Sequence, residues 1–416
     1  MQLDLDAWLA EMEAAHPDPY TRISREAFHA RVREARARLP ETLDPLEYFA
    51  VLQSLASVLR DGHTRFHLPK ESAAYSEDWF PLKIRVQEGR AFVAEPRGDI
   101  ARGCEITRIN SAPAARVLDF ARGLASDDIV ASDALVAGLF VPALWLVGVR
   151  APFRVEGLSV RREPIDVVLD EKIPRWVPPE QPDYRLEWLD ANVAYMAIDD
   201  MVDVPGFGPF AQAAFSEIEQ KKATGLVIDL RRNGGGSTDV ADMLLDRITD
   251  KPYRIVAEKY WRVSARQRAQ LAGTPWLPPD YLAAPLGTTL HYRNSPYSPR
   301  VVRPVFRGPV CILIGPQTGS SAMMLANAIE DYQVATLIGE PTSSPPNYFS
   351  QYLSFPLPRT LLEAEVSTAR FVRANGDVTN TDPVMPDIVV HQRIEEWLRD
   401  EDPVLRRAQT WISTRR

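Results

Sequence analysis

The chain has 416 residues, of which 45% are hydrophobic and 25% are charged, and its formal net charge is −8. These values are typical of a globular protein with a large core, and the length allows two or three domains. The negative charge argues against a nucleic-acid partner, because such a surface needs clustered basic residues. With only two cysteines, Cys104 and Cys311, a disulfide framework and a cysteine-based zinc site are not expected.

The first twenty residues contain Asp and Glu throughout, without the basic start and apolar run of a signal peptide. The sequence also contains no uninterrupted stretch of 18 apolar residues, so no membrane span is expected. We therefore expect a cytoplasmic protein, or an extracytoplasmic one if a leader has been removed.

Helices are predicted over most of residues 1–60. Leu5, Trp8 and Met12 recur at near-helical spacing, Ser24 is placed to cap a second helix, and a third is expected over 45–59. Strands are predicted at 79–86 and 91–94, paired across a Gly-containing turn, and again at 103–113 before a helix from 114. An apolar insertion at 125–150, strands near 153–169 and a proline-rich linker around 174–182 follow.

A short D-G-H-T segment at 61–64 ends the helical region. Its histidine, His63, is either a structural residue or a general base, since imidazole titrates near neutral pH. His67 lies four residues further on, which is a metal-ligand spacing on a helix. Alternation of residues between the two histidines favours a strand, however, and no Glu lies between them, so a metal site is not expected.

Residues 184–250 indicate a mostly parallel sheet covered by helices, because apolar strands at 193–198 and 225–230 alternate with helices at 207–222 and 238–248. A glycine-rich turn at 233–237 follows the second strand. It has neither the P-loop nor the dinucleotide-binding spacing, which argues against a phosphate site. Two interpretations stay open: a tight turn with no further role, or a close approach of backbone amides to a reacting carbonyl.

A buried strand at 310–314, a Gly-Pro break and a helix through 332 surround Ser320. Serine at such a position is either an N-cap or a nucleophile, because free backbone amides and the helix dipole favour an anionic oxygen there. The segment 250–305, rich in proline and tyrosine and poorly periodic, is expected to be a lid or a binding surface.

Three motifs in order resemble the tail-specific, or C-terminal-processing, serine proteases: D-L-R-x-N-x-G-G at 229–236, T-x-S-x-A at 318–322 leading to G-E-P-T at 339–342, and P-D-I at 386–388. The resemblance implies a crotonase-like ββα core, with Ser320 as nucleophile and an oxyanion hole from amides of Ser321 and of Gly235 or Gly236. D-G-H-T and the region after it are similar to a family member's N-terminal part with a PDZ-like module.

The chain departs from the family at the base. Many members use a lysine just past G-E-x-T, whereas the last lysine here is Lys259. The tricorn-core branch uses a histidine instead, and His63 matches that branch. That branch also has a Glu before P-D. Here the neighbourhood offers Asp382, which can stabilise an imidazolium, and Asn380, which can only orient it. Glu340 is a further candidate.

A second departure is Met323, where many relatives have Glu, and the sequence offers no account of it. We thus expect an α/β protein with a crotonase-like core, an N-terminal helical cap and a degenerate PDZ-like module. The expected domains are 1–75 (cap), 76–180 (PDZ-like), 181–392 (catalytic) and 393–416 (a C-terminal helix).

The predicted function is a serine peptidase that acts on peptides or proteins through an acyl-enzyme, with no cofactor and no metal. Two alternatives stay open: a non-proteolytic acyl-transfer enzyme, such as an esterase or biosynthetic cyclase, and an inactive peptide-binding module. Substrate preference and oligomeric state are not predicted.

Overall fold

The computed structural model describes residues 1–40, 42–72, 79–126, 132–170 and 183–415. The chain forms two compact units, each built from three separate segments. Unit 1 comprises Met1–Pro178, Trp261–Leu290 and Phe349–Ala369, and unit 2 comprises Pro179–Tyr260, His291–Tyr348 and Arg370–Arg416. The proline-rich linker expected around 174–182 lies outside the described residues.

Unit 1 begins with the three predicted helices, α1 (Gln2–Ala15), α2 (Arg25–Arg38) and α3 (Pro45–Ser57). The predicted cap is confirmed, since the Ser24 hydroxyl accepts a hydrogen bond from the Ala27 amide. Asp44 starts α3 through a capping box, in which two otherwise unpaired backbone donors are satisfied. Trp8, Phe28 and Phe49 point into the core of the unit.

An antiparallel sheet with strand order β2-β3-β4-β6-β7 follows, and β5 pairs with β4. The predicted hairpin is present, with β2 and β3 paired from Ile84↔Val93 to Gln87↔Arg90. Helix α5 contacts β3 and β4, and α6, formed by the apolar insertion, contacts β2. The elements are β2 (Ile84–Gln87), β3 (Arg90–Val93), β4 (Glu105–Ile109), β5 (Ala112–Pro113), α5 (Ala114–Leu124), α6 (Asp133–Leu146), β6 (Phe153–Leu158) and β7 (Pro164–Leu169).

A second sheet has the order β1-β16-β11-β12, with β15 also paired to β16. It organises much of the 250–305 segment, which contains two strands and two short helices where the sequence showed little periodicity. Strand β11 has one partner, β16, from a distant part of the chain, and β12 pairs with β11 beyond the two short helices, so local pattern gives little sign of either strand. The elements are β1 (Arg65–Phe66), β11 (Glu258–Arg262), α9 (Ala265–Leu271), α10 (Pro279–Ala283), β12 (Thr289–Arg293), β15 (Tyr348–Pro356) and β16 (Glu363–Val372).

Unit 2 contains the predicted sheet, in the order β17-β14-β13-β10-β9-β8. All neighbours in it pair in parallel except β8 and β9. Strands β9, β10 and β13 are buried along their whole length, as expected for a parallel sheet with both faces covered. The strands are β8 (Tyr184–Trp188), β9 (Val193–Ile198), β10 (Gly225–Asp229), β13 (Val310–Ile314), β14 (Thr336–Gly339) and β17 (Ile388–Val389).

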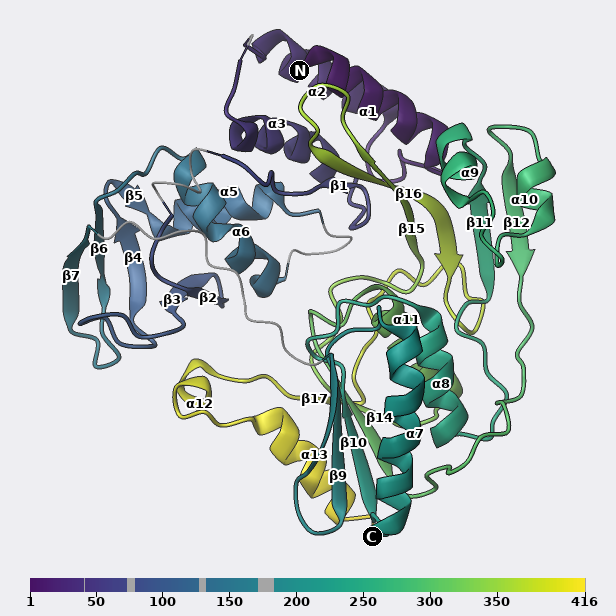
Figure 1. Cartoon of the computed structure of the whole chain (residues 1–416). Helices are drawn as coiled ribbons and strands as arrows, with labels where there is room; N and C mark the ends of the chain where they lie inside the picture. The colour runs from purple at the N-terminus through teal and green to yellow at the C-terminus, as the bar shows by residue number, and fades with distance from the viewer. Residues whose placement is uncertain (41, 73–78, 127–131, 171–182, 416) are drawn as a thin grey trace. The chain divides into compact units, whose positions relative to one another are not determined.

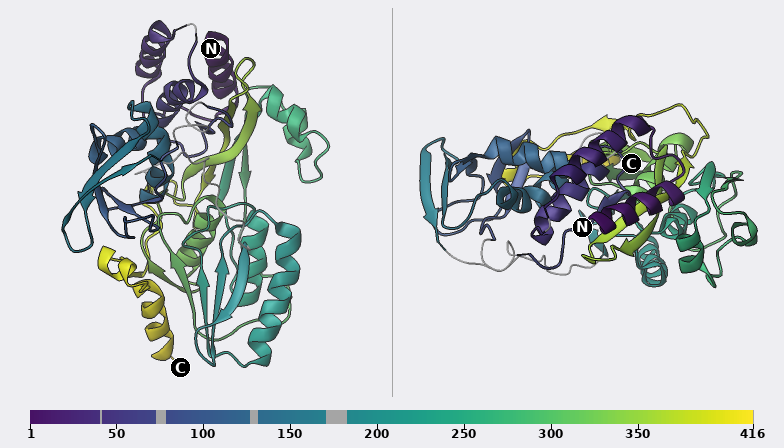
Figure 2. Two further views of the ribbon diagram at one scale, coloured as in Figure 1. Left: turned by 60° about the vertical axis from the view of Figure 1, so that its left-hand side comes forward. Right: turned by 90° about the horizontal axis from the view of Figure 1, so that it is seen from above.

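Helices cover both faces of this sheet. Figure 1 shows α7 (Val204–Gln220), α8 (Thr238–Ile248) and α11 (Ser320–Tyr332) on one face. Figure 2 shows the C-terminal segment, in yellow, on the opposite face, where α13 (Pro403–Ser413) contacts β10, β13 and β14. Each face has its own apolar cluster.

The C-terminal segment forms two helices, α12 (Ile394–Leu398) and α13, where the sequence was expected to form one. The break follows from Pro403, which occupies the first turn of α13 directly after its N-cap, Asp402. Proline is favoured there because that position needs no amide donor. Among the described residues, no helix combines the length and the apolar character needed to cross a bilayer.

Candidate active site

Ser320 lies at a sharp strand-to-helix turn between β13 and α11. The structure places Gly319 at the N-cap and Ser320 as the first helical residue, and the turn has no side-chain cap. The N-cap interpretation of Ser320 is therefore wrong. Its φ of 45° is in the left-handed region, which is strained by roughly 1–2 kcal/mol for a residue with a Cβ. Strained main chain at a serine that is only half-buried is consistent with a nucleophile turn.

Hydrogen bonds join this turn to the loop that follows β10. The buried Thr318 hydroxyl donates to the Leu230 carbonyl at 2.8 Å and accepts from the Gly315 amide at 3.0 Å. One residue on, the Gly319 amide donates to the Asn233 carbonyl at 2.9 Å. The Ser320 backbone is thus held on its N-terminal side by contacts that involve no charged group.

The glycine-rich loop touches the serine turn directly. A Cβ on Gly235 would lie 2.6 Å from the Ser320 Cβ and 2.9 Å from the Ser321 nitrogen, closer than real Cβ contacts. Gly235 and Gly236 also have φ values of 111° and 139°, which L side chains rarely adopt. The loop therefore requires glycine at both positions, and at Gly235 this lets the backbone lie against the serine turn. An approach of its amides to a reacting carbonyl stays a prediction.

The amides around this contact differ in availability. The Gly235 amide donates to the Asn233 side-chain oxygen at 2.9 Å. Within the described residues, the amides of Gly236 and Ser321 have no recorded acceptor. The Ser321 hydroxyl donates to the Gly236 carbonyl at 2.6 Å, which joins the two loops. Two free donors beside a serine hydroxyl are the arrangement that an oxyanion hole needs.

The strand end below the loop is held by an ion-pair cluster. Arg231 contacts Asp229 on β10 at 2.6 Å and Asp402 at the start of α13 at 2.7 Å. Tyr195 donates to Asp229 from the neighbouring strand. Burial opposes ionisation of Asp402, but the hydrogen bonds and the charge of Arg231 lower its pKa overall. The D-L-R motif therefore fixes the base of the glycine loop to α13.

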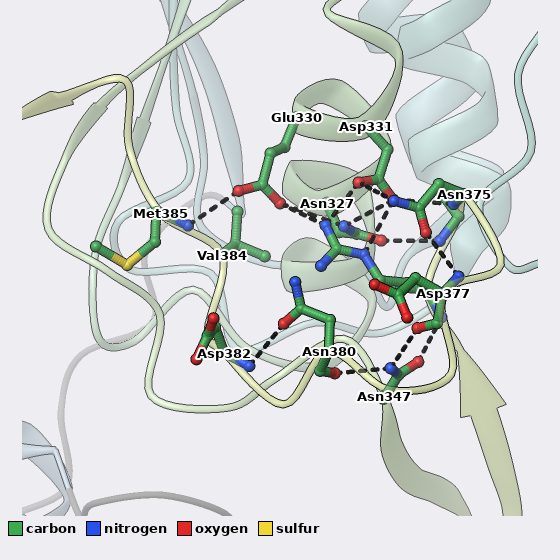
Figure 3. A network of polar contacts seen from close by, with 12 residues as sticks. Asn327, Glu330, Asp331, Asn347, Asn375, Asp377, Asn380, Asp382, Val384 and Met385 are labelled. Carbon is green, nitrogen blue, oxygen red and sulfur yellow. Dashed lines mark hydrogen bonds and ion pairs between the residues drawn. The ribbon is translucent and has the colours of Figure 1, made fainter.

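The loop that carries Asn380 and Asp382 is anchored to the C-terminal half of α11 (Figure 3). The Asp331 carboxylate pairs with Arg373 at 2.6 Å and accepts from the Asn375 amide at 2.9 Å. Asn380 accepts the Asp382 amide through its side-chain oxygen. The helix that begins with Ser320 thus also supports the segment with the acid candidates.

The three orienting candidates have different surroundings. Asp382 is exposed, and its carboxylate has no recorded partner among the described residues. Asn380 is half-buried, and its carbonyl accepts from the Asn347 side chain at 2.7 Å. Glu340 forms an ion pair with His391 at 3.1 Å on the surface. Of the two candidate carboxylates, that of Glu340 is already paired.

His63 belongs to unit 1, in a turn organised by the buried Asp61. The Asp61 carboxylate accepts from the His63 amide at 2.9 Å, from the Thr64 hydroxyl at 2.5 Å, and contacts the buried His16 ring at 3.1 Å. The Asp18 amide donates to the other His16 ring nitrogen, so the nitrogen facing Asp61 carries the proton. Three donors thus hold one carboxylate behind His63.

Burial lowers the pKa of the half-buried His63, against the charges of Asp61 and Glu365 and a hydrogen bond with the Phe349 backbone, which raise it. A lowered pKa keeps the imidazole neutral at neutral pH, as a base requires. His67 contacts Glu365 at 2.8 Å. No group of three or more potential ligand side chains suited to a metal ion occurs in the part of the chain that the structure describes.

Sequence reasoning missed the residues that hold these turns, chiefly Asn233, Asp61 and His16. Asn233 is part of the D-L-R-x-N motif and Asp61 is part of D-G-H-T, so the motifs themselves mark both residues. His16 is 45 residues from its partner Asp61, and no local pattern signals that pairing.

The chain is similar to one known protein family over part of its length and to several solved structures in its fold. Residues 192–390 match the family model described as Peptidase family S41. The crystal structure of a serine-to-alanine mutant of CPAF is similar, with a TM-score of 0.70 and 13% identity over 98% of both chains. Mature CPAF has a TM-score of 0.65 and 14% identity, covering 95% of this chain and 94% of that chain. At such identity the likeness concerns the fold alone.

Proposed function

Since the protein is a serine peptidase, with its S41 match at residues 192–390, we propose that Ser320 is the nucleophile and His63 the general base. One observation carries this proposal above the others: the strained Ser320 turn is in contact with a glycine loop, beside two amides without recorded acceptors. Ser320 is not the N-cap of α11, because Gly319 occupies that position.

The reaction would proceed by acyl transfer. His63 takes the proton of the Ser320 hydroxyl as its oxygen attacks the carbonyl carbon of the substrate peptide bond. The amides of Ser321 and Gly236 stabilise the resulting oxyanion, while Gly235 leaves room for it. The C–N bond then breaks, and the proton passes from His63 to the leaving amine. Water repeats these steps, with His63 as its base, and frees the acyl group and Ser320.

The third member of the site is proposed to be Asp382. Its carboxylate is exposed and has no recorded partner among the residues that the structure describes, which supports this choice over Glu340, whose carboxylate is in an ion pair. Asn380 would then be an orienting residue, since its side chain accepts the Asp382 amide and so fixes the local loop. This assignment puts the chain in the histidine-using branch of the family.

We extend the proposal to the architecture and the substrate. The parallel sheet of unit 2 with α7, α8 and α11 would be the crotonase-like core, and the β2–β7 sheet with α5 and α6 the PDZ-like module. The family match supports a peptide or protein substrate.

The test is covalent labelling with a fluorophosphonate probe, read as intact mass, on wild type, Ser320→Ala and His63→Ala. We expect one adduct on wild type, none on Ser320→Ala, and labelling slowed by at least about 10³-fold in His63→Ala. An adduct on folded Ser320→Ala would contradict the nucleophile, and wild-type labelling of His63→Ala would contradict the base. Far-UV circular dichroism establishes that each variant is folded.

A peptide-substrate screen then tests peptidase activity itself. A library of unstructured peptides is incubated with wild type and with Ser320→Ala, and new termini are identified by mass spectrometry. Cleavage by wild type alone supports the proposal. Labelling of Ser320 without cleavage of any peptide would favour a different acyl-transfer reaction at the same serine.

A further inference from the structure

The second strand of the β15–β16 pair carries Glu365, and the first, β15, lies against the His63 turn. Two aromatic side chains of β15 contact histidines there. The Tyr352 ring is stacked on the His63 ring, with centroids 6.1 Å apart and planes 19° apart. The Phe349 ring contacts the buried His16 ring at 4.5 Å. The Asp61 carboxylate contacts the His16 ring and accepts from the His63 backbone amide, so β15 covers a compact cluster built around that carboxylate.

An irregularity in β15 places Tyr352 at this position. Buried and more exposed residues alternate from Tyr348 to Gln351, and the alternation then slips by one residue. At the slip, Gln351 has a φ of 52°, and its carbonyl accepts a hydrogen bond from the Thr368 hydroxyl. A one-residue slip turns the following side chains to the other face of a strand. Tyr352 is therefore 49% exposed, although it lies near the middle of the strand.

We propose that Tyr352 is a positioning residue for the general base, which fixes the plane of the His63 imidazole and keeps water from one of its faces. This inference rests on the proposed role of His63. Offset stacking at this separation is favourable for aromatic rings, and it restricts rotation of a side chain that has to meet a hydroxyl in one orientation. The exposed tyrosine ring has little part in the core, so its position next to the base accounts for it better than packing does.

The charged groups that face His63 are Asp61 on its own turn, Arg65 on β1 and Glu365 on β16. They stay in place when Tyr352 is replaced. Loss of the tyrosine ring therefore changes mainly the exposure of the imidazole to water. Since burial is the largest influence that lowers the pKa of His63, its removal should raise that pKa towards the ordinary value of about 6.5.

The experiment compares Tyr352→Leu, which removes the ring, with Tyr352→Phe, which keeps it. The matched control is Tyr297→Leu, because Tyr297 is also a half-exposed tyrosine that packs against another ring, that of Tyr253, although their planes are tilted by 54°. For each variant, the rate of Ser320 labelling by the fluorophosphonate probe is measured against pH. The titration of His63 is followed by NMR and assigned with the His63→Gln variant.

We expect Tyr352→Leu to label about tenfold more slowly, with the midpoint of the acid limb and the NMR midpoint of His63 both moved to higher pH. Tyr352→Phe should restore the rate and both midpoints, and Tyr297→Leu should match wild type. An unmoved NMR midpoint in Tyr352→Leu overturns the inference, whatever the labelling rate. So does a wild-type labelling rate in that variant while His63→Ala remains inactive.

Failure of the proposed function has a different signature. In that case His63→Ala labels as fast as wild type, and no Tyr352 variant changes the labelling rate. The NMR midpoint would still report whether Tyr352 shields His63, so the stacking and the role of His63 as a base are tested separately.

Discussion

The turn that carries Ser320 and the turn that carries His63 are stabilised by different kinds of contact. Around Ser320 the partners are backbone groups and small neutral side chains, such as Thr318 and Asn233, and the fit depends on a missing Cβ at Gly235. Around His63 the partners are the buried carboxylate of Asp61, a second histidine and aromatic rings from β15. The first turn is defined by shape, and the second by charge and ring packing.

This difference determines how each turn should respond to change. A turn defined by shape tolerates changes of pH but not added atoms. A turn held by a buried ionised group tolerates small changes of volume, but it is sensitive to the charge state of that group. Substitutions that add one methyl group or remove one charge therefore probe the two turns separately.

The largest effect is expected for Gly235→Ala. The added Cβ would be 2.6 Å from the Ser320 Cβ and would require the backbone to move, so labelling of Ser320 should slow by about 10²–10³-fold. Gly234→Ala is the matched control, because a Cβ there meets nothing within 4 Å and its φ is not in the positive range. Equal labelling rates for the two variants would show that the glycine contact has no role in reactivity.

A large effect is also expected for Asp382→Asn. If the carboxylate stabilises the imidazolium formed during the reaction, peptide turnover should fall at least about tenfold, with little change in KM. Glu340→Gln is the control, since its ion pair with His391 is on the surface and contributes less than about 1 kcal/mol. Wild-type turnover and an unchanged pH–rate profile in Asp382→Asn would remove Asp382 from the site.

Asp61→Asn tests the charge-dependent turn. The negative charge of Asp61 raises the pKa of His63, so its removal should lower that pKa and move the acid limb of labelling to lower pH, opposite to the shift expected for Tyr352→Leu. Asparagine also matches the three donors less well, which should lower the free energy of unfolding by about 1–3 kcal/mol. Denaturant unfolding and the pH profile measure both effects. A shift to higher pH would contradict this account.

A smaller effect is expected for Asp402→Asn, measured as the free energy of unfolding. The Asp402 side chain is 34% exposed and the Arg231 side chain 25%, and Arg231 keeps its ion pair with Asp229 in the variant. The free energy of unfolding should therefore fall by only about 1 kcal/mol. The folded-state pKa of Asp402 is lowered, so its contribution is complete above the unfolded value of about 3.9 and declines as pH falls through the folded value. The difference from wild type should thus persist at pH 5–7 and shrink below about pH 4. A difference that is the same at pH 3 would contradict the ion pair.

The smallest effect is expected for Lys259→Met. Burial lowers the pKa of Lys259 to about 7, a value suited to a base, and the methionine side chain resembles the lysine stem in volume. With His63 as the base, labelling should be unchanged between pH 6 and 9. Loss of labelling in Lys259→Met, together with retention in His63→Ala, would assign the base to the lysine.

The sequence also predicts the Ser320 turn better than the His63 turn. The strand, break and helix around Ser320 and the parallel sheet beneath were predicted, because short apolar strands and glycine turns are local signals. The surroundings of His63 were not predicted, because β1 pairs with β16 and His16 contacts Asp61 across long separations in the sequence. The two C-terminal helices were expected as one, although Pro403 marks the start of the second. The roles of Ser320, His63 and Asp382 remain predictions.

The pairing of β1 with β16 has a consequence for the newly made protein. Arg65 and Glu365 are paired residues 300 positions apart, and β15, which stacks Tyr352 on His63, is translated only shortly before β16. On the ribosome, the segment with His63 emerges long before the strands that complete its surroundings, because Glu365 follows Arg65 by 300 residues. Such long-range pairing forms late and slowly. A nascent chain therefore lacks the ordered surroundings of His63 until both β15 and β16 have been translated.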